Sequence, residues 1–283
     1  MNAVRDALRK PESQRWRRRP GAEAAIMGVL NCTPNSFSDG GQFINVAKAV
    51  AHGLAMQRAG ADIIDIGGES TRPGAAPVAL DEELARVLPC VDGLVAAGCT
   101  VSIDSSKAEV IRQAVAAGAT MINDVSALTA DSASMAVAAD CTADICLMHM
   151  QGDPTTMQYA PHYDDPLTEV IEYLRQRVEA CLAAGISRQR LLVDPGIGFG
   201  KTVAHNLALL RGCSTMRTVL ELPLLIGLSR KSFLGQVTGL PVEQRDHASA
   251  LMAMVPLLGG CDIIRVHAVA LHRQACKIAA ALE

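Results

Sequence analysis

Three polar side chains close three separate apolar runs, an arrangement suited to recognising a polar ring. Asp104 ends the run "VSID", Asn123 the run "MIN" and Asp194 the run "LLVD". Carboxylates accept hydrogen bonds, whereas a side-chain amide both accepts and donates them. If the three runs are strands that end in one place, the set can read the edge of a flat nitrogen heterocycle with several N–H groups. It would make a poor metal cage, because no His or Glu lies beside these acceptors.

Cationic side chains follow the last two apolar runs of the chain. Lys231 lies in "LIGLSRKSFLG", and Arg265 and His267 lie in "IIRVHA". Arg72, in the Gly- and Pro-rich segment "GGESTRPGA", could reach the same place. These donors suit a phosphate or diphosphate group. A surface salt bridge is the alternative for each arginine.

The segment "DPGIGFGKT" resembles two nucleotide-binding motifs but fits neither. Only three residues separate Gly196 from Gly200, where a Walker A motif needs four, and Lys201 occupies the third glycine position of G-x-G-x-x-G. We interpret the segment as a loop whose backbone approaches a ligand closely, with Phe199 offering a face for stacking.

A repeated unit positions these residues. A helical segment ends in Gly, a short apolar strand follows, and the strand closes on a polar residue, as in "RAGADIIDIGGES" and "AAGCTVSIDSS". Eight such alternations predict a single-domain (β/α)₈ barrel, which builds its active site at the C-terminal strand ends and commonly binds phosphate after the last two strands. A doubly wound open sheet is the alternative. The predicted strands are Ile26–Asn31, Ile63–Gly67, Val101–Asp104, Met121–Asp124, Ile145–Met148, Leu191–Asp194, Leu224–Leu228 and Ile263–Val266.

Composition excludes several classes of protein. The net charge of −3 gives no electrostatic reason to expect nucleic acid or an anionic membrane as a partner. No apolar run is long enough for a membrane helix, and the start of the chain has no signal-peptide core. The nine cysteines are scattered without a C-x-x-C pair, which favours reduced, mostly buried thiols in a cytoplasmic protein.

The first residues differ in composition from the rest. The segment "RDALRKPESQRWRRRPG" is rich in Arg and weak in periodicity. We expect residues 1–22 to form a basic, solvated and partly disordered lead-in, and residues 23–283 to form the barrel. An anion-contacting or targeting arm is the alternative.

Eight segments in register resemble the dihydropteroate synthase family of bacterial folate synthesis, from about Ile26 to the end of the chain. They include "MGVLNCTPNSFSDGG", "GADIIDIGGESTRPGA", "SIDSSK", "LLVDPGIGFGK", "LLIGLSRKSFLG" and "IIRVHAV". The resemblance implies a pterin-binding barrel that joins 6-hydroxymethyl-7,8-dihydropterin diphosphate to 4-aminobenzoate, releasing diphosphate. It also implies Mg²⁺ as cofactor, a homodimer, and an aminobenzoate site that sulfonamides mimic, although sulfonamide sensitivity depends on loop geometry.

By the same resemblance each candidate residue takes a role. The resemblance implies that the pterin ring is bound by Asp104, Asn123, Asp194 and Lys231, and the diphosphate by Arg265 and His267. It implies that Asn31 binds the Mg²⁺ and that the aminobenzoate site is lined by Thr71, Arg72, Phe199 and Ser232. Asp104, Lys231, Arg265 and His267 are the expected catalytic residues. The segment Cys32–Gly41 resembles a mobile lid of the family that keeps out water.

Four positions depart from the family pattern. Asn35 stands where many members have Asp, and Ser126 stands where some have Arg. Cys32 replaces the usual aliphatic residue, and Ser105 replaces Thr but keeps a hydroxyl.

Two other readings remain open: a non-catalytic pterin-binding paralogue, and a pterin-dependent methyltransferase. The methyltransferase needs no diphosphate site, so the cations Lys231, Arg265 and His267 argue against it, while only Asn35 hints at the paralogue.

Overall fold

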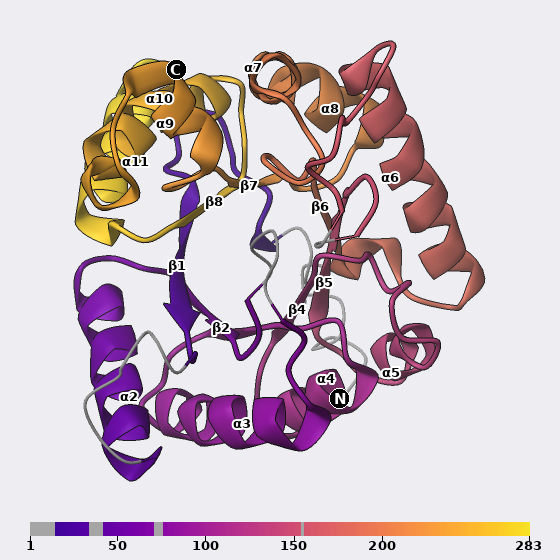
Figure 1. Cartoon of the computed structure of the whole chain (residues 1–283), viewed down its shortest axis with the longest axis vertical. Coiled ribbons are helices and arrows are strands. Elements are labelled where there is room, and N and C mark those ends of the chain that lie inside the picture. Colours follow the sequence, from indigo (N-terminus) through magenta and orange to yellow (C-terminus); the bar gives the residue numbers. More distant parts are fainter. Residues whose placement is uncertain (1–14, 34–41, 71–75, 154–155) are drawn as a thin grey trace, which may run out of the picture.

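Eight parallel strands form a barrel in the computed structural model, which describes residues 15–33, 42–70, 76–153 and 156–283 (Figure 1). The strands are β1 (Ala25–Asn31), β2 (Ile63–Gly67), β3 (Val101–Asp104), β4 (Met121–Asp124), β5 (Asp144–Met148), β6 (Leu191–Asp194), β7 (Leu225–Gly227) and β8 (Ile263–Val266). The predicted (β/α)₈ barrel is confirmed. Predicted and observed strands coincide or differ by one residue at one end, and at both ends for β7, because continuous apolar runs mark strands that are buried on both faces.

Strand pairing runs nearly all the way around the barrel. The hydrogen-bonded order is β6-β5-β4-β3-β2-β1-β8-β7, and every pair is parallel. A single parallel bridge between Val193 and Leu224 joins β6 to β7 and completes the circle. The C-terminal ends of all eight strands therefore open on one face.

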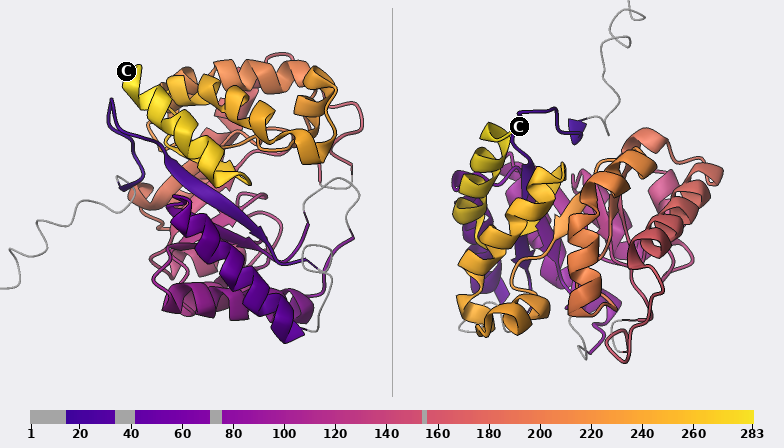
Figure 2. Two further views of the ribbon diagram at one scale, coloured as in Figure 1. Left: turned by 90° about the vertical axis from the view of Figure 1, so that its left-hand side faces the viewer. Right: turned by 90° about the horizontal axis from the view of Figure 1, so that it is seen from above.

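Helices form the outer layer of the barrel (Figures 1 and 2). They are α2 (Gln42–Arg58), α3 (Leu80–Ala96), α4 (Ala108–Ala116), α5 (Ser134–Ala139), α6 (Pro166–Ala183), α7 (Val203–Arg211), α8 (Cys213–Leu220), α9 (Ser232–Thr238), α10 (Asp246–Leu258) and α11 (Val269–Ala281), with short 3₁₀ turns η3 (Arg188–Arg190) and η4 (Val242–Gln244).

Local sequence signals explain where several helices begin and end. Asp165 caps α6 by accepting from Leu167 N at 3.1 Å, and Pro166 occupies the first helical position. Gly98 and Gly118 follow α3 and α4 with φ of 78° and 108°. Such positive values suit Gly, so the repeated "AAG" marks the turn from each helix into the next strand.

Strand alternation divides the barrel interior into an apolar layer and a polar layer. Met121, Leu192 and Ile263 belong to one buried apolar cluster, which also takes residues from four other strands. Because side chains two positions apart share a face, the next inward residues are Asn123, Asp194 and Arg265. These three lie at or near the C-terminal ends of their strands. The alternation therefore places polar groups directly above an apolar floor.

Trp16 closes the apolar layer from the N-terminal end of the barrel. Its side chain belongs to the interior cluster and is only 7% exposed, and its Nε1 donates to Asp144 Oδ2 at 2.6 Å. Arg18 is also buried: its backbone N donates to Asp262 Oδ1 at 2.7 Å, and its guanidinium pairs with Glu283. We expected residues 1–22 to be a solvated lead-in. In the described part of that segment, from residue 15 onward, Trp16 and Arg18 are buried and hold the segment against the barrel, whereas its other arginines are exposed to solvent.

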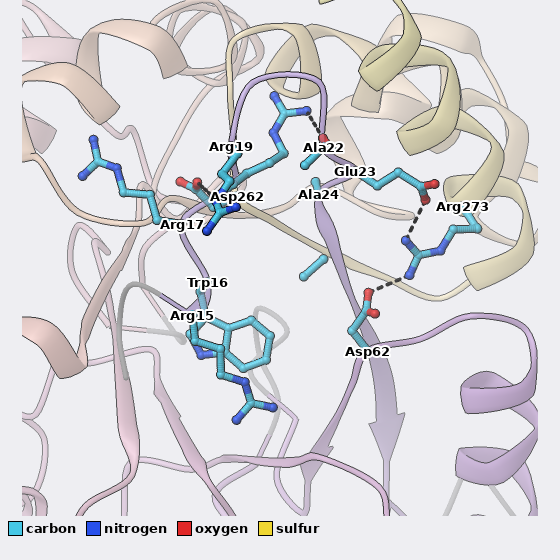
Figure 3. A pocket seen from close by; sticks show the side chains of 12 residues that line it. Arg15, Trp16, Arg17, Arg19, Ala22, Glu23, Ala24, Asp62, Asp262 and Arg273 are labelled. Atoms are coloured by element: carbon cyan, nitrogen blue, oxygen red, sulfur yellow. Dashed lines mark hydrogen bonds and ion pairs between the residues drawn. The ribbon is translucent and has the colours of Figure 1, made fainter. Parts of the chain in front are cut away.

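A cavity of about 660 Å³ lies beside this N-terminal segment, at the end of the barrel opposite the C-terminal strand ends (Figure 3). Its cations are largely engaged in holding the chain together. Arg273 donates to Glu23 and Asp62, and Arg18 donates to the carbonyl oxygens of Ala22 and Leu257. We therefore regard the cavity as a structural feature and look for chemistry at the other end.

The burial of Trp16 predicts a stability cost. Trp16→Ala should lower the free energy of unfolding by about 3 kcal/mol, because it leaves a cavity in the apolar floor and removes one hydrogen bond to the buried carboxylate of Asp144. Urea unfolding measures the change. Arg19→Ala is the control: Arg19 is exposed in the same segment, and its loss should cost less than about 0.5 kcal/mol. Equally small effects of both substitutions would contradict the conclusion that Trp16 closes the N-terminal end of the barrel.

Candidate active site

A hydrogen-bonded network of charged and polar side chains lies across the barrel mouth, which is the open face at the C-terminal ends of the strands. Arg265 Nε donates to Asp65 Oδ2 at 2.6 Å, and its Nη2 donates to Asp104 Oδ2 at 2.6 Å. Asn123 Nδ2 donates to the same Asp65 oxygen at 3.0 Å. The structure thus brings together three of the predicted site residues, from β3, β4 and β8, and adds Asp65 of β2 as their common partner.

Asp65 was missed by the sequence reading because it lies inside an apolar strand rather than at its end. The signal was the single acid in "IIDIG", which matches the single cation in "IIRV" of β8. The side chain of Asp65 is fully buried, and its Oδ1 has no hydrogen-bond partner among the described residues. Its negative charge is therefore compensated mainly by Arg265, which it holds in place.

Burial and neighbouring charges have opposing effects on the pKa values of Arg265 and Asp104. Burial tends to lower the pKa of Arg265, but Asp65 and Asp104 outweigh it and the net pKa is raised, so the guanidinium stays charged. For Asp104, burial raises the pKa to about 7, opposed by Arg265 and reinforced by the neighbouring charge of Asp65. Asp104 therefore changes its charge near neutral pH.

Asp194 and Lys231 are a second set of charged groups in the mouth whose charges influence each other, while Lys231 Nζ donates to the carbonyl oxygen of Ile197. Burial raises the pKa of Asp194, although the charge of Lys231 and a hydrogen bond from Gly196 N at 2.7 Å oppose the rise. Burial lowers the pKa of Lys231 to about 8, and Asp194 opposes that fall. Gly227 of β7 lies between Asp194 and Arg265, since a Cβ there would be 3.9 Å from Asp194 Oδ2 and 3.7 Å from Arg265 Cβ. The missing side chain leaves room over the apolar floor.

The loop after β6 carries the predicted stacking residue. Phe199 is half-buried, and Lys231 Nζ lies 4.4 Å from its ring centroid. Gly196 has a φ of 67°, and a Cβ there would come within 1.8 Å of the carbonyl oxygen of His149. The close backbone approach expected for this loop is thus present, although it is made to the β5 segment.

A buried Lys–His pair supports that loop and was not anticipated. Lys201 Nζ lies 2.9 Å from His149 Nδ1 and 2.9 Å from the carbonyl oxygen of Phe199. Burial lowers the pKa of Lys201 well below its usual value, and burial together with Lys201 lowers the pKa of His149 to about 3. A neutral imidazole can therefore accept from Lys201, and this contact fixes the backbone at Phe199.

The turn after β7 and the end of β8 position the remaining predicted groups. His267 Nδ1 lies 3.0 Å from Ser229 Oγ, which also accepts from His267 N at 3.2 Å. Arg230 adopts a left-handed φ of 61° and pairs with Asp246 at 2.6 Å, which anchors the turn to α10. Ser232 is exposed as the first residue of α9, directly after Lys231.

Comparison with known proteins agrees with this geometry. Residues 27–267 match the family model described as pterin binding enzyme. The chain is 46% identical over 245 residues to dihydropteroate synthase of Escherichia coli K12, covering 86% of each sequence, and 41% identical to that of Mycobacterium leprae, covering 92% of this chain and 94% of the relative. The solved dihydropteroate synthase of Xanthomonas albilineans with 4-aminobenzoic acid superposes with a TM-score of 0.87 at 45% identity, covering 93% of this chain and 94% of the other.

The chain belongs to the dihydropteroate synthase family of pterin-binding enzymes. A second structure of the Xanthomonas albilineans enzyme, in complex with 7,8-dihydropteroate, has a TM-score of 0.83 at 42% identity and covers 94% of this chain and 96% of the other. The family resemblance read from the sequence is thereby confirmed.

Asn31 is the one side chain that the family resemblance offered for a metal ion. It is half-buried at the end of β1, where its backbone pairs with Gly67. Within the described ranges, no group of three or more His, Cys, Asp and Glu side chains could enclose a metal ion. A single amide oxygen nevertheless fits Mg²⁺, which usually keeps several waters and binds through one or two protein groups plus substrate phosphates.

Some residues that the dihydropteroate synthase resemblance singled out lie outside the described residues. These are Thr71, Arg72, Asn35 and most of the segment Cys32–Gly41. The base of the Arg72 segment is described. There Lys107 pairs with Glu69 and with the buried Glu83, which ties the chain after β2 to α3.

Ser126, the second departure from the family pattern, stabilises its own loop. Its N donates to Asp124 Oδ1 at 2.8 Å, its hydroxyl contacts the same carboxylate, and its hydroxyl accepts from Ala130 N at 3.2 Å. Asp124 also accepts from Leu128 N at 2.8 Å. The serine thus anchors the turn after β4 from within, and Arg177 of α6 supports the same turn by donating to the carbonyl oxygen of Ala127 at 3.1 Å.

Proposed function

We propose that the barrel mouth of this chain joins 6-hydroxymethyl-7,8-dihydropterin diphosphate to 4-aminobenzoate, giving 7,8-dihydropteroate and diphosphate. One observation carries the proposal: the buried acceptors Asn123 and Asp194 and the partly buried Asp104 share one mouth with the cations Lys231 and Arg265. Curated relatives of this chain are dihydropteroate synthases, so the chain is a transferase of this class.

The pterin ring would be held by the acceptors and by Lys231. A dihydropterin displays several ring and exocyclic N–H donors, which match the carboxylates of Asp104 and Asp194 and the amide of Asn123. Lys231 adds a donor to a ring acceptor. These groups come from strand ends and the turn after β7, so they are preorganised and cost little to order on binding.

The diphosphate would be held by Arg265 and His267. The bonds from Arg265 to the two carboxylates use Nε and Nη2, and its Nη1 makes no hydrogen bond within the described residues. Those N–H groups can donate to an anion, and the Ser229 hydroxyl orients the imidazole of His267 beside it. Both groups stabilise negative charge as the diphosphate departs, and ionised Asp104 stabilises positive charge on the dihydropterin.

We also propose Asn31 as the protein ligand of a Mg²⁺ ion that accompanies the diphosphate. Bound Mg²⁺ would supply further neutralisation of the leaving group. The support is the position of Asn31 at the end of β1, beside the strand that carries Arg265.

The aminobenzoate would lie between Phe199 and Ser232, with Thr71 and Arg72 contributing from the segment after β2. Phe199 offers a ring face, and Ser232 offers an exposed hydroxyl beside Lys231. The amine of the aminobenzoate then attacks the exocyclic methylene carbon of the pterin, and diphosphate leaves. The relative crystallised with 4-aminobenzoic acid supports this substrate.

The two alternative readings are less well supported. A pterin-dependent methyltransferase has no use for cations that bind diphosphate, and a non-catalytic paralogue would be expected to have a damaged anion site. Here Arg265 and Lys231 are both placed in the mouth. The curated relatives with 41–46% identity are synthases.

We propose a homodimer that uses α10. Leu251, Val255 and Leu258 lie three or four residues apart and are 74%, 39% and 50% exposed, which gives one helix face an apolar row. The opposite side of the same helix buries Ala253 and Leu257. An exposed apolar row of this kind suits contact with a second copy.

The compartment is also part of the proposal. All nine cysteines are unpaired and eight are buried, which supports a reducing compartment such as the cytoplasm. No helix in the described parts of the chain is long and apolar enough to cross a membrane. A Yersinia pestis dihydropteroate synthase was crystallised with a sulfonamide, which supports the proposal that sulfonamides compete at the aminobenzoate position.

Diphosphate release is the direct test of the proposed reaction. Release and dihydropteroate formation should require Mg²⁺, dihydropterin diphosphate and 4-aminobenzoate together. Lys231→Met and Asp194→Asn should weaken pterin binding roughly 10- to 100-fold in calorimetric titration, because each removes a charge-assisted hydrogen bond. Lys277→Met, at an exposed lysine of α11, is the matched control and should change neither quantity. Tight pterin binding without turnover by the unaltered chain would instead favour the paralogue.

The pKa shifts in the mouth predict a narrow pH range for activity. Below about 7 Asp104 takes up a proton and loses its charge, and above about 8 Lys231 loses its proton. The ratio kcat/KM for dihydropterin diphosphate should therefore fall on both sides of this range. In Asp104→Asn the acidic limb near pH 7 should be lost, because an amide does not titrate. An acidic limb that stays in place in this variant would show that Asp104 does not control it.

A further inference from the structure

Two cysteine sulfurs meet beside the last residues of β1. Cys32 directly follows Asn31, and Cys90 lies in the middle of α3. Their sulfur atoms are 3.5 Å apart, in van der Waals contact. All nine cysteines lie in the described parts of the chain, and no other pair of them makes a sulfur–sulfur contact of hydrogen-bond type.

Backbone contacts hold both partners at this distance. Cys32 N donates to the carbonyl oxygen of Gly67 at 2.8 Å, which continues the pairing of β1 with β2. Arg86, one turn before Cys90 on α3, donates to the carbonyl oxygen of Gly68 at 2.7 Å. Cys32 and the helix that carries Cys90 are therefore tied to consecutive residues at the end of β2 and just after it. A disulfide requires the sulfurs to approach by only about 1.5 Å more, since its bond length is about 2.05 Å.

We propose that Cys32 and Cys90 are an oxidation site, at which a peroxide forms a reversible disulfide that lowers the activity of the neighbouring site. Cys32 is 8% exposed and Cys90 1%, so a peroxide reaches the pair from the side of Cys32. One of the two sulfurs attacks a peroxide oxygen, the O–O bond breaks, and water leaves behind a sulfenic acid. The other sulfur then displaces the sulfenic oxygen as a second water. The two thiols lose two electrons and two protons in total, and hydrogen peroxide becomes two waters.

The consequence for activity follows from the place of Cys32 in the chain and rests on the proposed function. Asn31, the proposed Mg²⁺ ligand, is bonded directly to Cys32. Pulling Cys32 toward α3 by an appreciable fraction of 1.5 Å shifts the end of β1. Misplacement of a positioning group by about 1 Å can cost up to roughly 100-fold in rate, so a loss on the order of tenfold in kcat/KM for dihydropterin diphosphate is expected.

The covalent step is tested first and does not depend on activity. The full-length protein is reduced, freed of reductant, treated with hydrogen peroxide, digested without reduction and analysed by mass spectrometry. The expected product is a peptide pair joined through Cys32 and Cys90 that disappears after dithiothreitol. If the protein stays folded and both cysteines remain as thiols, or pair with other cysteines, the proposal is overturned.

The functional step is then measured on the same samples. The reduced enzyme must first convert its substrates to dihydropteroate. Inactive reduced protein would contradict the proposed function, but it would not affect the result of the cross-linking experiment. Oxidised enzyme should lose activity about tenfold and regain it with dithiothreitol. Cys32→Val and Cys90→Val keep the packing volume and should resist the loss. Cys181→Ala, a buried cysteine of α6 without a sulfur neighbour, is the matched control and should remain sensitive. A cross-linked enzyme with unchanged kcat/KM would refute the regulatory role.

Discussion

The ion pair between Asp65 and Arg265 is the interaction on which the barrel mouth depends. A fully buried carboxylate is costly unless a charge and hydrogen bonds compensate it, and Arg265 Nε supplies both at 2.6 Å. The same guanidinium reaches Asp104, and the same carboxylate accepts from Asn123. Four side chains from four strands thus share one network. An anion that approaches Arg265 meets a cation that the fold has already oriented, so little reorganisation opposes binding.

The N-terminal end of the barrel contributes mainly to stability, and the C-terminal end carries the groups for binding and chemistry. At the N-terminal end Trp16 covers an apolar layer, and the ion pair of Arg18 with Glu283 fastens that segment to the C-terminus of the chain. At the other end the same strands present Asp65, Asp194 and other polar groups two residues further on. Strand alternation makes this division possible without any change of backbone direction. Substitutions at the floor should therefore act on folding, and those at the mouth on binding.

Much of this arrangement could be predicted from the sequence. Apolar runs between helices that end in Gly predicted the barrel, and the position of Asp104, Asn123 and Asp194 at strand ends identified them as site residues. Both signals are local in the sequence. Asp65 and Trp16 could not be found in this way. Asp65 interrupts an apolar run, and its role depends on Arg265, 200 residues later in the chain. Trp16 lies among arginines without periodicity, and its burial depends on a barrel end that forms only when all strands close. The Lys201–His149 contact likewise joins two loops through tertiary structure.

The central role of the Asp65–Arg265 ion pair is tested most directly by the kinetics of the Asp65→Asn variant. This substitution keeps the size of the side chain and removes its charge. We expect the folded barrel to persist while kcat/KM for dihydropterin diphosphate falls on the order of 100-fold, because Arg265 and Asn123 lose their common anchor. Asp92→Asn, at an exposed carboxylate of α3, is the matched control and should match the unaltered chain. A folded Asp65→Asn enzyme with unchanged kcat/KM would show that Arg265 needs no buried partner and would contradict the central role of this ion pair.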